Sequence, residues 1–115
     1  REIDFGLWDG LTYKMALRKY GRLYRRWLED PFAQDIPRGE KISVFILRVK
    51  KAVMSIISAN QNKTVALVSH LGALRVILNT FLELKPEDFW KLKLESGAIY
   101  IIELNGKLKA RVKSI

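Results

Sequence analysis

The sequence contains no cysteine and only one histidine, and these two absences restrict its chemistry. Without cysteine the chain can form no disulfide, no thiolate zinc site and no cysteine nucleophile. A single histidine also excludes a metal site built from several histidine ligands. We therefore expect neither a metal nor any other cofactor.

Long hydrophobic runs are missing as well. No apolar stretch approaches the roughly 18 residues that a membrane span needs, and no signal-peptide pattern opens the chain. The 115 residues, 49% of them hydrophobic, are enough for one domain with a core. We expect a single cytoplasmic domain over residues 1–115, and the absence of an initiator Met before Arg1 suggests that further residues precede it.

Acidic residues are few: 12 Asp and Glu stand against 21 Lys and Arg, which gives a net charge of +9. Such an excess favours an acidic partner, whether nucleic acid, a membrane surface or a phosphorylated small molecule. Six cations lie in one stretch with no acid among them: Lys14, Arg18, Lys19, Arg22, Arg25 and Arg26. No helix-turn-helix, zinc-finger or aromatic RNA-binding signature accompanies this charge. A basic nucleic-acid-binding module is thus an alternative supported by charge alone.

The first half of the chain predicts two helices. Residues 1–10 contain two glycines and indicate extended chain and turns. Thr12 is a suitable N-cap for a helix that reaches Leu28, with a break at Gly21. Apolar residues then recur at helical spacing from residue 42 to 57, which predicts a long helix ending near Asn60.

The second half adds strands. Residues 64–69 are apolar at consecutive positions, which is typical of a central parallel strand buried on both faces. A buried helix is expected from about residue 72 to 84, and a short helix opens at 85–87. Asn105-Gly106 between residues 98–104 and 107–114 predicts a hairpin with a type I′ turn. Its last strand would carry four cations on one face and suits a sheet edge: Lys107, Lys109, Arg111 and Lys113.

This order of elements is α/β, but the sheet is incomplete. A parallel strand that is buried on both faces needs strand neighbours, and the chain offers only a hairpin. We expect the missing strands either before Arg1 or on another chain.

His70 is the first candidate for chemistry. It follows the apolar residues 64–69 and precedes a helix that contains Gly72. Ligands of open α/β sheets bind outside the carboxyl ends of the strands, and a helix N-terminus there attracts anions. An imidazole at this point could bind a phosphate. The alternative is that His70 only caps the helix or fills a polar core position.

The second candidate is the segment of residues 1–10, in which three carboxylates, two glycines and two aromatic residues stand close together. A carboxyl group that is kept protonated by an apolar wall can act as a general acid. The alternative is a solvated acidic turn.

Three stretches together resemble the histidine phosphatase superfamily, which is also called phosphoglycerate mutase-like. Residues 2–12 resemble the family's E-x-x-(F/Y)-G-x-W-E-G-L-T segment, with Asp9 in place of the usual Glu. The middle region resembles W-x-x-D-P, P-x-G-E-S and R-V through Trp27, Asp30-Pro31, Pro37, Gly39-Glu40 and Arg48-Val49, with Lys41 in place of Ser. Residues 68–75 resemble the strand-end motif that carries the family's second catalytic histidine.

The resemblance implies roles for individual residues. Glu2 would protonate the leaving-group oxygen, and His70 would stabilise the charge of the transferring phosphoryl group. The first N–H groups after it, at Leu71 and Gly72, would bind the phosphate, although many members have Gly where Leu71 stands. Arg75 is expected to hold its helix through an internal ion pair.

The family's nucleophilic histidine, in an Arg-His-Gly motif, is absent from these residues, as are its two phosphate-gripping arginines. The resemblance therefore implies the C-terminal portion of a three-layer α/β/α fold with a mainly parallel central sheet and a C-terminal antiparallel hairpin. The complete protein would hydrolyse phosphate monoesters through a phosphohistidine without a metal. The given chain alone would be inactive.

The short segment over residues 12–31 is more similar to small phosphatases, including the α-ribazole phosphatase-like group, than to phosphoglycerate mutases. Mutase-type phosphoryl transfer is the first alternative. We expect a small phosphorylated metabolite as partner and no membrane. A homo-oligomer or a complementing N-terminal segment would supply strand neighbours.

Overall fold

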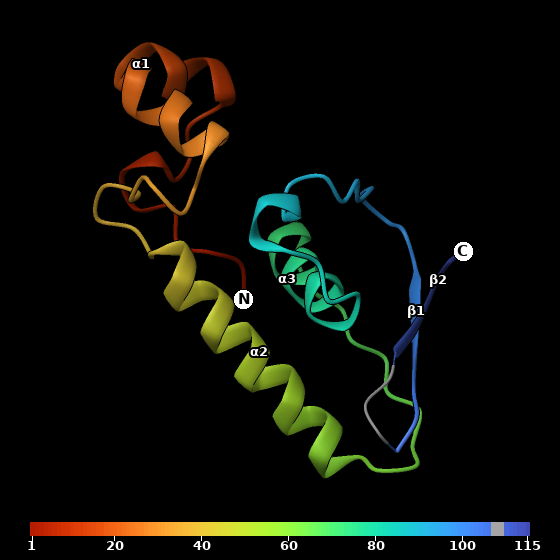
Figure 1. Cartoon of the computed structure of the whole chain (residues 1–115). Coiled ribbons are helices and arrows are strands. Elements are labelled where there is room, and N and C mark those ends of the chain that lie inside the picture. Colours follow the sequence, from red (N-terminus) through yellow and green to blue (C-terminus); the bar gives the residue numbers. More distant parts are fainter. Residues whose placement is uncertain (107–109) are drawn as a thin grey trace. The chain divides into compact units, whose positions relative to one another are not determined.

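A computed structural model of the chain describes residues 1–106 and 110–115 (Figure 1). In chain order, the elements are η1 (Gly6–Trp8), α1 (Tyr13–Glu29), α2 (Ile42–Ala59), α3 (Leu71–Phe81), η2 (Pro86–Asp88), β1 (Tyr100–Leu104) and β2 (Ala110–Ser114). They form two compact units: one comprises Ile3–Arg48, and the other joins Arg1–Glu2 to Val49–Ile115. Within the described ranges, no helix is both long and apolar enough to cross a membrane.

Helix α1 begins and bends where the sequence predicts. The Thr12 side chain accepts a hydrogen bond from the Met15 N–H at 3.2 Å, which satisfies one of the free donors of the first turn. At Gly21 the backbone takes φ 43° and ψ −107°, a conformation that L-residues rarely adopt, and the helix bends there. The predicted break is therefore confirmed.

Aromatic rings form the core of the unit Ile3–Arg48. The buried Trp8 ring lies 5.0 Å from Tyr24, 5.6 Å from Trp27 and 6.2 Å from Tyr20 between ring centroids. The contacts with Tyr24 and Trp27 are edge-to-face, a geometry that the ring quadrupoles favour. The core face of α1 is thereby covered, while its six basic residues are all exposed.

Residues 4–7 are fastened to the loop of residues 36–40 by main-chain bonds. The Leu7 N–H donates to the Pro37 carbonyl at 3.0 Å, and the Glu40 N–H donates to the Asp4 carbonyl at 2.8 Å. Gly6 has φ +50°, and a Cβ there would overlap the main chain of residues 37–39. This segment is thus a shaped turn, as its two glycines predict.

In the other unit, α3 ends three residues before the predicted Leu84. Glu83 adopts φ +53°, which no helix continues, and the Leu84 N–H turns back to the Asn79 carbonyl at 3.2 Å. The antiparallel hairpin is confirmed: β1 and β2 pair with Tyr100 opposite Ser114 and Leu104 opposite Ala110. The predicted type I′ turn at Asn105-Gly106 is wrong, because neither residue has the positive φ that this turn requires and five residues separate Leu104 from Ala110. Of the hairpin's four predicted outward cations, Lys107 and Lys109 lie outside the described residues.

The prediction of a buried strand at residues 64–69 is wrong for this structure. The segment forms no ladder, and the exposed fractions of Val65, Leu67 and Val68 are 46%, 42% and 98%. Among the described residues the sheet contains only β1 and β2. A strand is held by hydrogen bonds to its neighbours, and here β1 pairs with β2 while residues 64–69 have no such neighbour among the described residues.

Candidate active site

Two distant parts of the sequence meet at the N-terminus of α3. The Oε2 atom of Glu2 accepts a hydrogen bond from the Gly72 N–H at 2.7 Å, across 70 residues of sequence, and both residues belong to the same compact unit. His70 is the N-cap of the same helix, and Leu71 is its first residue. The structure thus brings together all four predicted site residues.

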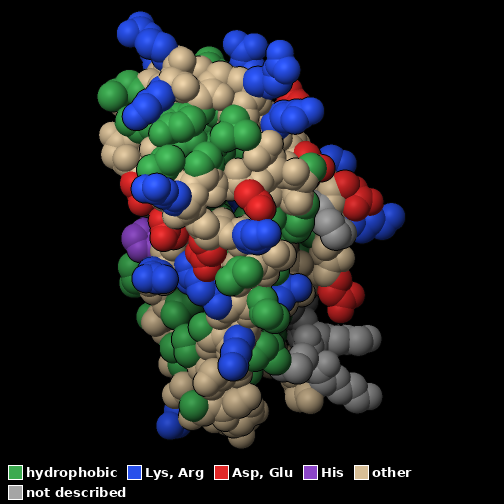
Figure 2. Space-filling model, turned by 90° about the vertical axis from the view of Figure 1, so that its left-hand side faces the viewer, with side chains coloured by type: hydrophobic (Ala, Val, Ile, Leu, Met, Phe, Trp, Pro, Cys, Tyr) green, Lys and Arg blue, Asp and Glu red, His purple; other side chains and the backbone are tan. Residues whose placement is uncertain are grey.

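His70 stands at the helix end with extended backbone, φ −99° and ψ 161°, and its side chain makes no capping bond. Its carbonyl accepts the first intrahelical bond, from the Leu74 N–H at 2.8 Å. The side chain is exposed, and Figure 2 shows the one histidine at the molecular surface. The alternative interpretation of His70, as a side-chain cap or a buried polar residue, therefore does not describe it.

Gly72 permits the approach of the Glu2 carboxylate. A Cβ built on Gly72 would overlap Oε1 and would lie only 3.0 Å from Cδ and Oε2. Any larger residue at this position would push the carboxylate away. The glycine is required here for close approach, since its φ is not in the left-handed region.

The electrostatics of this end suit an anion. The N–H groups of the first helical turn have no partner within the helix, and their dipoles favour negative charge. Glu2 occupies one of these donors, at Gly72, whereas the Leu71 N–H has no protein acceptor within the described part of the chain. A carboxylate, an exposed imidazole and a helix N-terminus are groups that can bind a phosphate and transfer a proton.

Arg75 does not form the predicted ion pair. It is 8% exposed, and its Nη1 donates to three main-chain carbonyls, at 3.2 Å to Phe89, at 3.4 Å to Trp90, and to Leu92. Its guanidinium also lies 5.1 Å from the centroid of the Trp90 ring. Burial lowers the pKa of Arg75 from its ordinary value. Arg75 therefore holds the chain that follows α3 in place. Its acceptors there are main-chain carbonyl groups and not the carboxylate that an ion pair would need.

The unit Ile3–Arg48 contains a charged pair that the sequence did not predict. The Glu40 carboxylate accepts from Arg48 Nε at 2.5 Å and from Nη2 at 2.9 Å. Both side chains are largely buried, with 11% and 29% exposure. Their spacing in the motif P-x-G-E followed by R-V was the available signal. The pair ties the loop before α2 to the helix.

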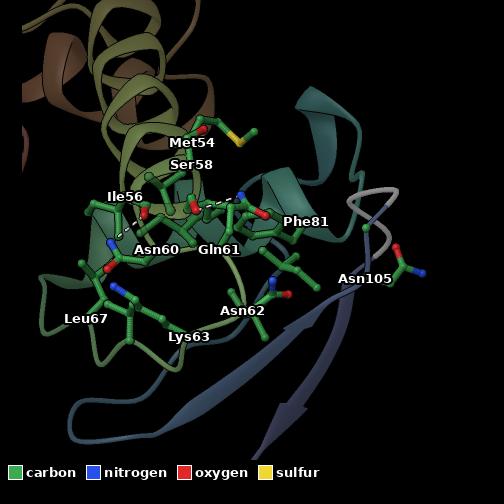
Figure 3. A pocket seen from close by; sticks show the side chains of 17 residues that line it. Met54, Ile56, Ser58, Asn60, Gln61, Asn62, Lys63, Leu67, Phe81 and Asn105 are labelled. Atoms are coloured by element: carbon green, nitrogen blue, oxygen red, sulfur yellow. Dashed lines mark hydrogen bonds between the residues drawn. The ribbon is translucent and has the colours of Figure 1, made fainter.

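A cavity of about 540 Å³ in the unit that contains α3 was also not predicted. Its walls come from the end of α2, the segment of residues 60–67, α3 and β1 (Figure 3). Two polar side chains labelled in Figure 3 donate hydrogen bonds to α2 carbonyls: Asn60 to Ile56 at 2.8 Å, and Gln61 to Ile57 at 3.0 Å. None of the four predicted site residues lines this cavity.

Comparison with known proteins agrees with these observations. The family model of the histidine phosphatase superfamily (branch 1) matches residues 1–114, so this chain belongs to that superfamily. A phosphoserine phosphatase 1 of Hydrogenobacter thermophilus is 27% identical over 112 residues, which are 97% of this chain.

Two solved structures resemble the chain over 99% of its length. Bacillus stearothermophilus YhfR has a TM-score of 0.88 at 25% identity, and the alpha-ribazole phosphatase from Shigella flexneri has a TM-score of 0.83 at 21% identity. The fold is therefore α/β and phosphoglycerate mutase-like. The chain spans about half the length of these proteins: 53% of the phosphoserine phosphatase and 56% of each structure.

Proposed function

We propose that the chain is part of a phosphate monoester hydrolase that acts through a phosphohistidine intermediate. The observation that carries this proposal is the Glu2–Gly72 hydrogen bond, which sets a carboxyl group at the helix end that His70 caps. Family membership and the phosphatase names of the relatives support it.

The chemistry needs two histidines, and the sequence contains one. In the first step, a nucleophilic histidine attacks phosphorus, the P–O bond to the leaving group breaks, and Glu2 gives its proton to the departing oxygen. In the second step, water attacks the phosphohistidine, loses its proton to Glu2, and releases inorganic phosphate and the free nucleophile. His70 stabilises the phosphoryl charge in both steps.

The nucleophile would come from a complementing segment, either elsewhere in the same polypeptide or on another chain. The cavity supports this part of the proposal, because apolar residues of an unpaired segment and of β1 face it together: Val65, Leu67, Ile102 and Leu104. β1 pairs with β2 along one edge only within the described sheet. A single inserted strand would bury these side chains and pair with main chain on both sides.

An intact mass tests the source of that segment. A mass well above the 13.3 kDa of these residues would place the nucleophile in the same polypeptide. A mass of 13.3 kDa together with phosphatase activity of the purified chain would contradict the proposal, because that chain has no second histidine.

The catalytic test uses whichever form of the protein is active, either the full polypeptide or the chain with its complementing segment. We expect hydrolysis of p-nitrophenyl phosphate in the presence of EDTA, and loss of activity on chelation would contradict the metal-free mechanism. His70→Ala should lower turnover by about a hundredfold or more, since it removes a preorganised charge stabiliser. A variant that folds and keeps near-normal turnover would show that His70 is outside the site.

The leaving group tests the role of Glu2. Glu2→Gln should lose most activity on alkyl phosphates and least on p-nitrophenyl phosphate, whose leaving group departs without a proton. Equal losses on both substrates would argue against a general acid. Phosphoserine and α-ribazole 5′-phosphate are the first natural substrates to compare, because relatives named for them share this fold.

A further inference from the structure

The N–H group of Gly72 was expected to bind phosphate, but in the structure it donates to Glu2. We propose that Gly72 is a positioning residue, which orients the carboxyl group of Glu2 for proton transfer. This inference rests on the proposed function, and it reassigns one of the two predicted phosphate donors.

The hydrogen bond distinguishes the two oxygens of the carboxyl group. The Gly72 N–H points at Oε2 from 2.7 Å, and an N–H donor cannot face an oxygen that carries a proton toward it. The carbonyl oxygen of a protonated carboxyl group is its better acceptor, so this contact favours the proton of Glu2 on Oε1. The contact fixes the place of the carboxyl group beside the His70 end of α3 and favours Oε1 as the oxygen that delivers the proton.

The missing side chain of Gly72 is what makes the contact possible. An alanine would keep the N–H group, but its Cβ would overlap the carboxyl group. The overlapped atoms are the far end of the Glu2 side chain, which can rotate away. Gly72→Ala should therefore leave the helix intact and displace the acid. If the N–H group bound phosphate instead, the same substitution would keep that donor and leave proton transfer unaffected.

The matched control is Ser55→Thr, because Ser55 is exposed on α2 and is not among the residues that line the cavity. Both substitutions add one methyl group. Only the substitution at Gly72 should affect proton transfer.

Amide hydrogen exchange tests the contact in the chain itself, without any need for activity. The Gly72 amide should be protected in the wild-type chain and should exchange faster in Glu2→Ala, which removes its acceptor. An unchanged exchange rate at residue 72 would overturn the proposal.

Kinetics in the active form of the protein test the consequence. We expect Gly72→Ala to lower kcat on an alkyl phosphate about tenfold or more, with KM and turnover of p-nitrophenyl phosphate nearly unchanged. The double variant Gly72→Ala with Glu2→Gln should be no slower than Glu2→Gln alone. Equal losses on both substrates, or no loss at all, would overturn the role of Gly72.

The two hypotheses fail differently. If Glu2→Gln itself shows no dependence on the leaving group, the proposed acid is wrong. If Glu2→Gln shows it and Gly72→Ala does not, the acid stands and the positioning role of Gly72 is refuted.

Discussion

Arg75 offers the sharpest test of how the chain after α3 is held. Its buried guanidinium serves the carbonyls of Phe89, Trp90 and Leu92 through one nitrogen and lies over the Trp90 ring. Arg75→Met keeps much of the side-chain length and removes the donors. These three carbonyls would then lose their charged partner.

The magnitude follows from these contacts. Two of the three hydrogen bonds, at 3.2 and 3.4 Å, are long and therefore weak. We treat the three together as equivalent to one or two hydrogen bonds to a charged group. Each such bond contributes about 1.5–3 kcal/mol, and a cation–π contact adds about 0.5–2 kcal/mol. Since burying the charge has a cost, we expect a net loss of about 2–4 kcal/mol in the free energy of unfolding. In a chain of 115 residues this lowers Tm by about 10 °C.

Urea unfolding and hydrogen exchange at residues 88–92 measure the effect. The control is Arg22→Met, which removes an exposed arginine and should change stability by less than about 0.5 kcal/mol. If Arg75→Met were as stable as this control, the carbonyl contacts of Arg75 would contribute nothing measurable to the free energy of unfolding.

Three further predictions concern the unit Ile3–Arg48. Glu40→Gln should cost about 1–3 kcal/mol in urea unfolding, because the largely buried guanidinium of Arg48 loses its charged acceptor; a smaller change would mean that solvent compensates. Gly21→Ala should cost about 1–3 kcal/mol through backbone strain at φ 43°, measured as a lower Tm, and an unchanged Tm would show that α1 straightens freely. Burial, with a smaller contribution from Tyr13, raises the pKa of Tyr24 above its ordinary 10.0. The folded chain then holds this proton more tightly than the unfolded chain, so stability should fall as pH rises beyond 10.0; Tyr24→Phe should weaken this fall, and an identical pH profile would contradict it.

Local chemistry made much of the fold predictable. The cap at Thr12 and the break at Gly21 each depend on backbone preferences of one or two residues, and neighbouring sequence contains that information. The Asn105-Gly106 pair correctly predicted a hairpin but not its turn, whose register depends on the two strands. The periodicity of residues 42–57 likewise predicts α2, because a helix repeats every 3.6 residues whatever lies around it. The family motifs are also short, local sequence patterns. For this reason the resemblance could indicate both Glu2 and His70 as site residues.

Contacts between distant residues were decided only by the tertiary structure. The same apolar pattern that predicts a strand at residues 64–69 cannot form one without hydrogen-bonding neighbours, and sequence alone does not state where those neighbours are. Arg75 was expected to meet a carboxylate, and it meets carbonyls, because the partner depends on how the chain turns after α3. In the same way, the resemblance to the family motifs made Glu2 and Gly72 candidates for the site. The hydrogen bond from the Gly72 N–H to the Glu2 carboxylate joins residues 70 positions apart, and no local pattern encodes such a contact.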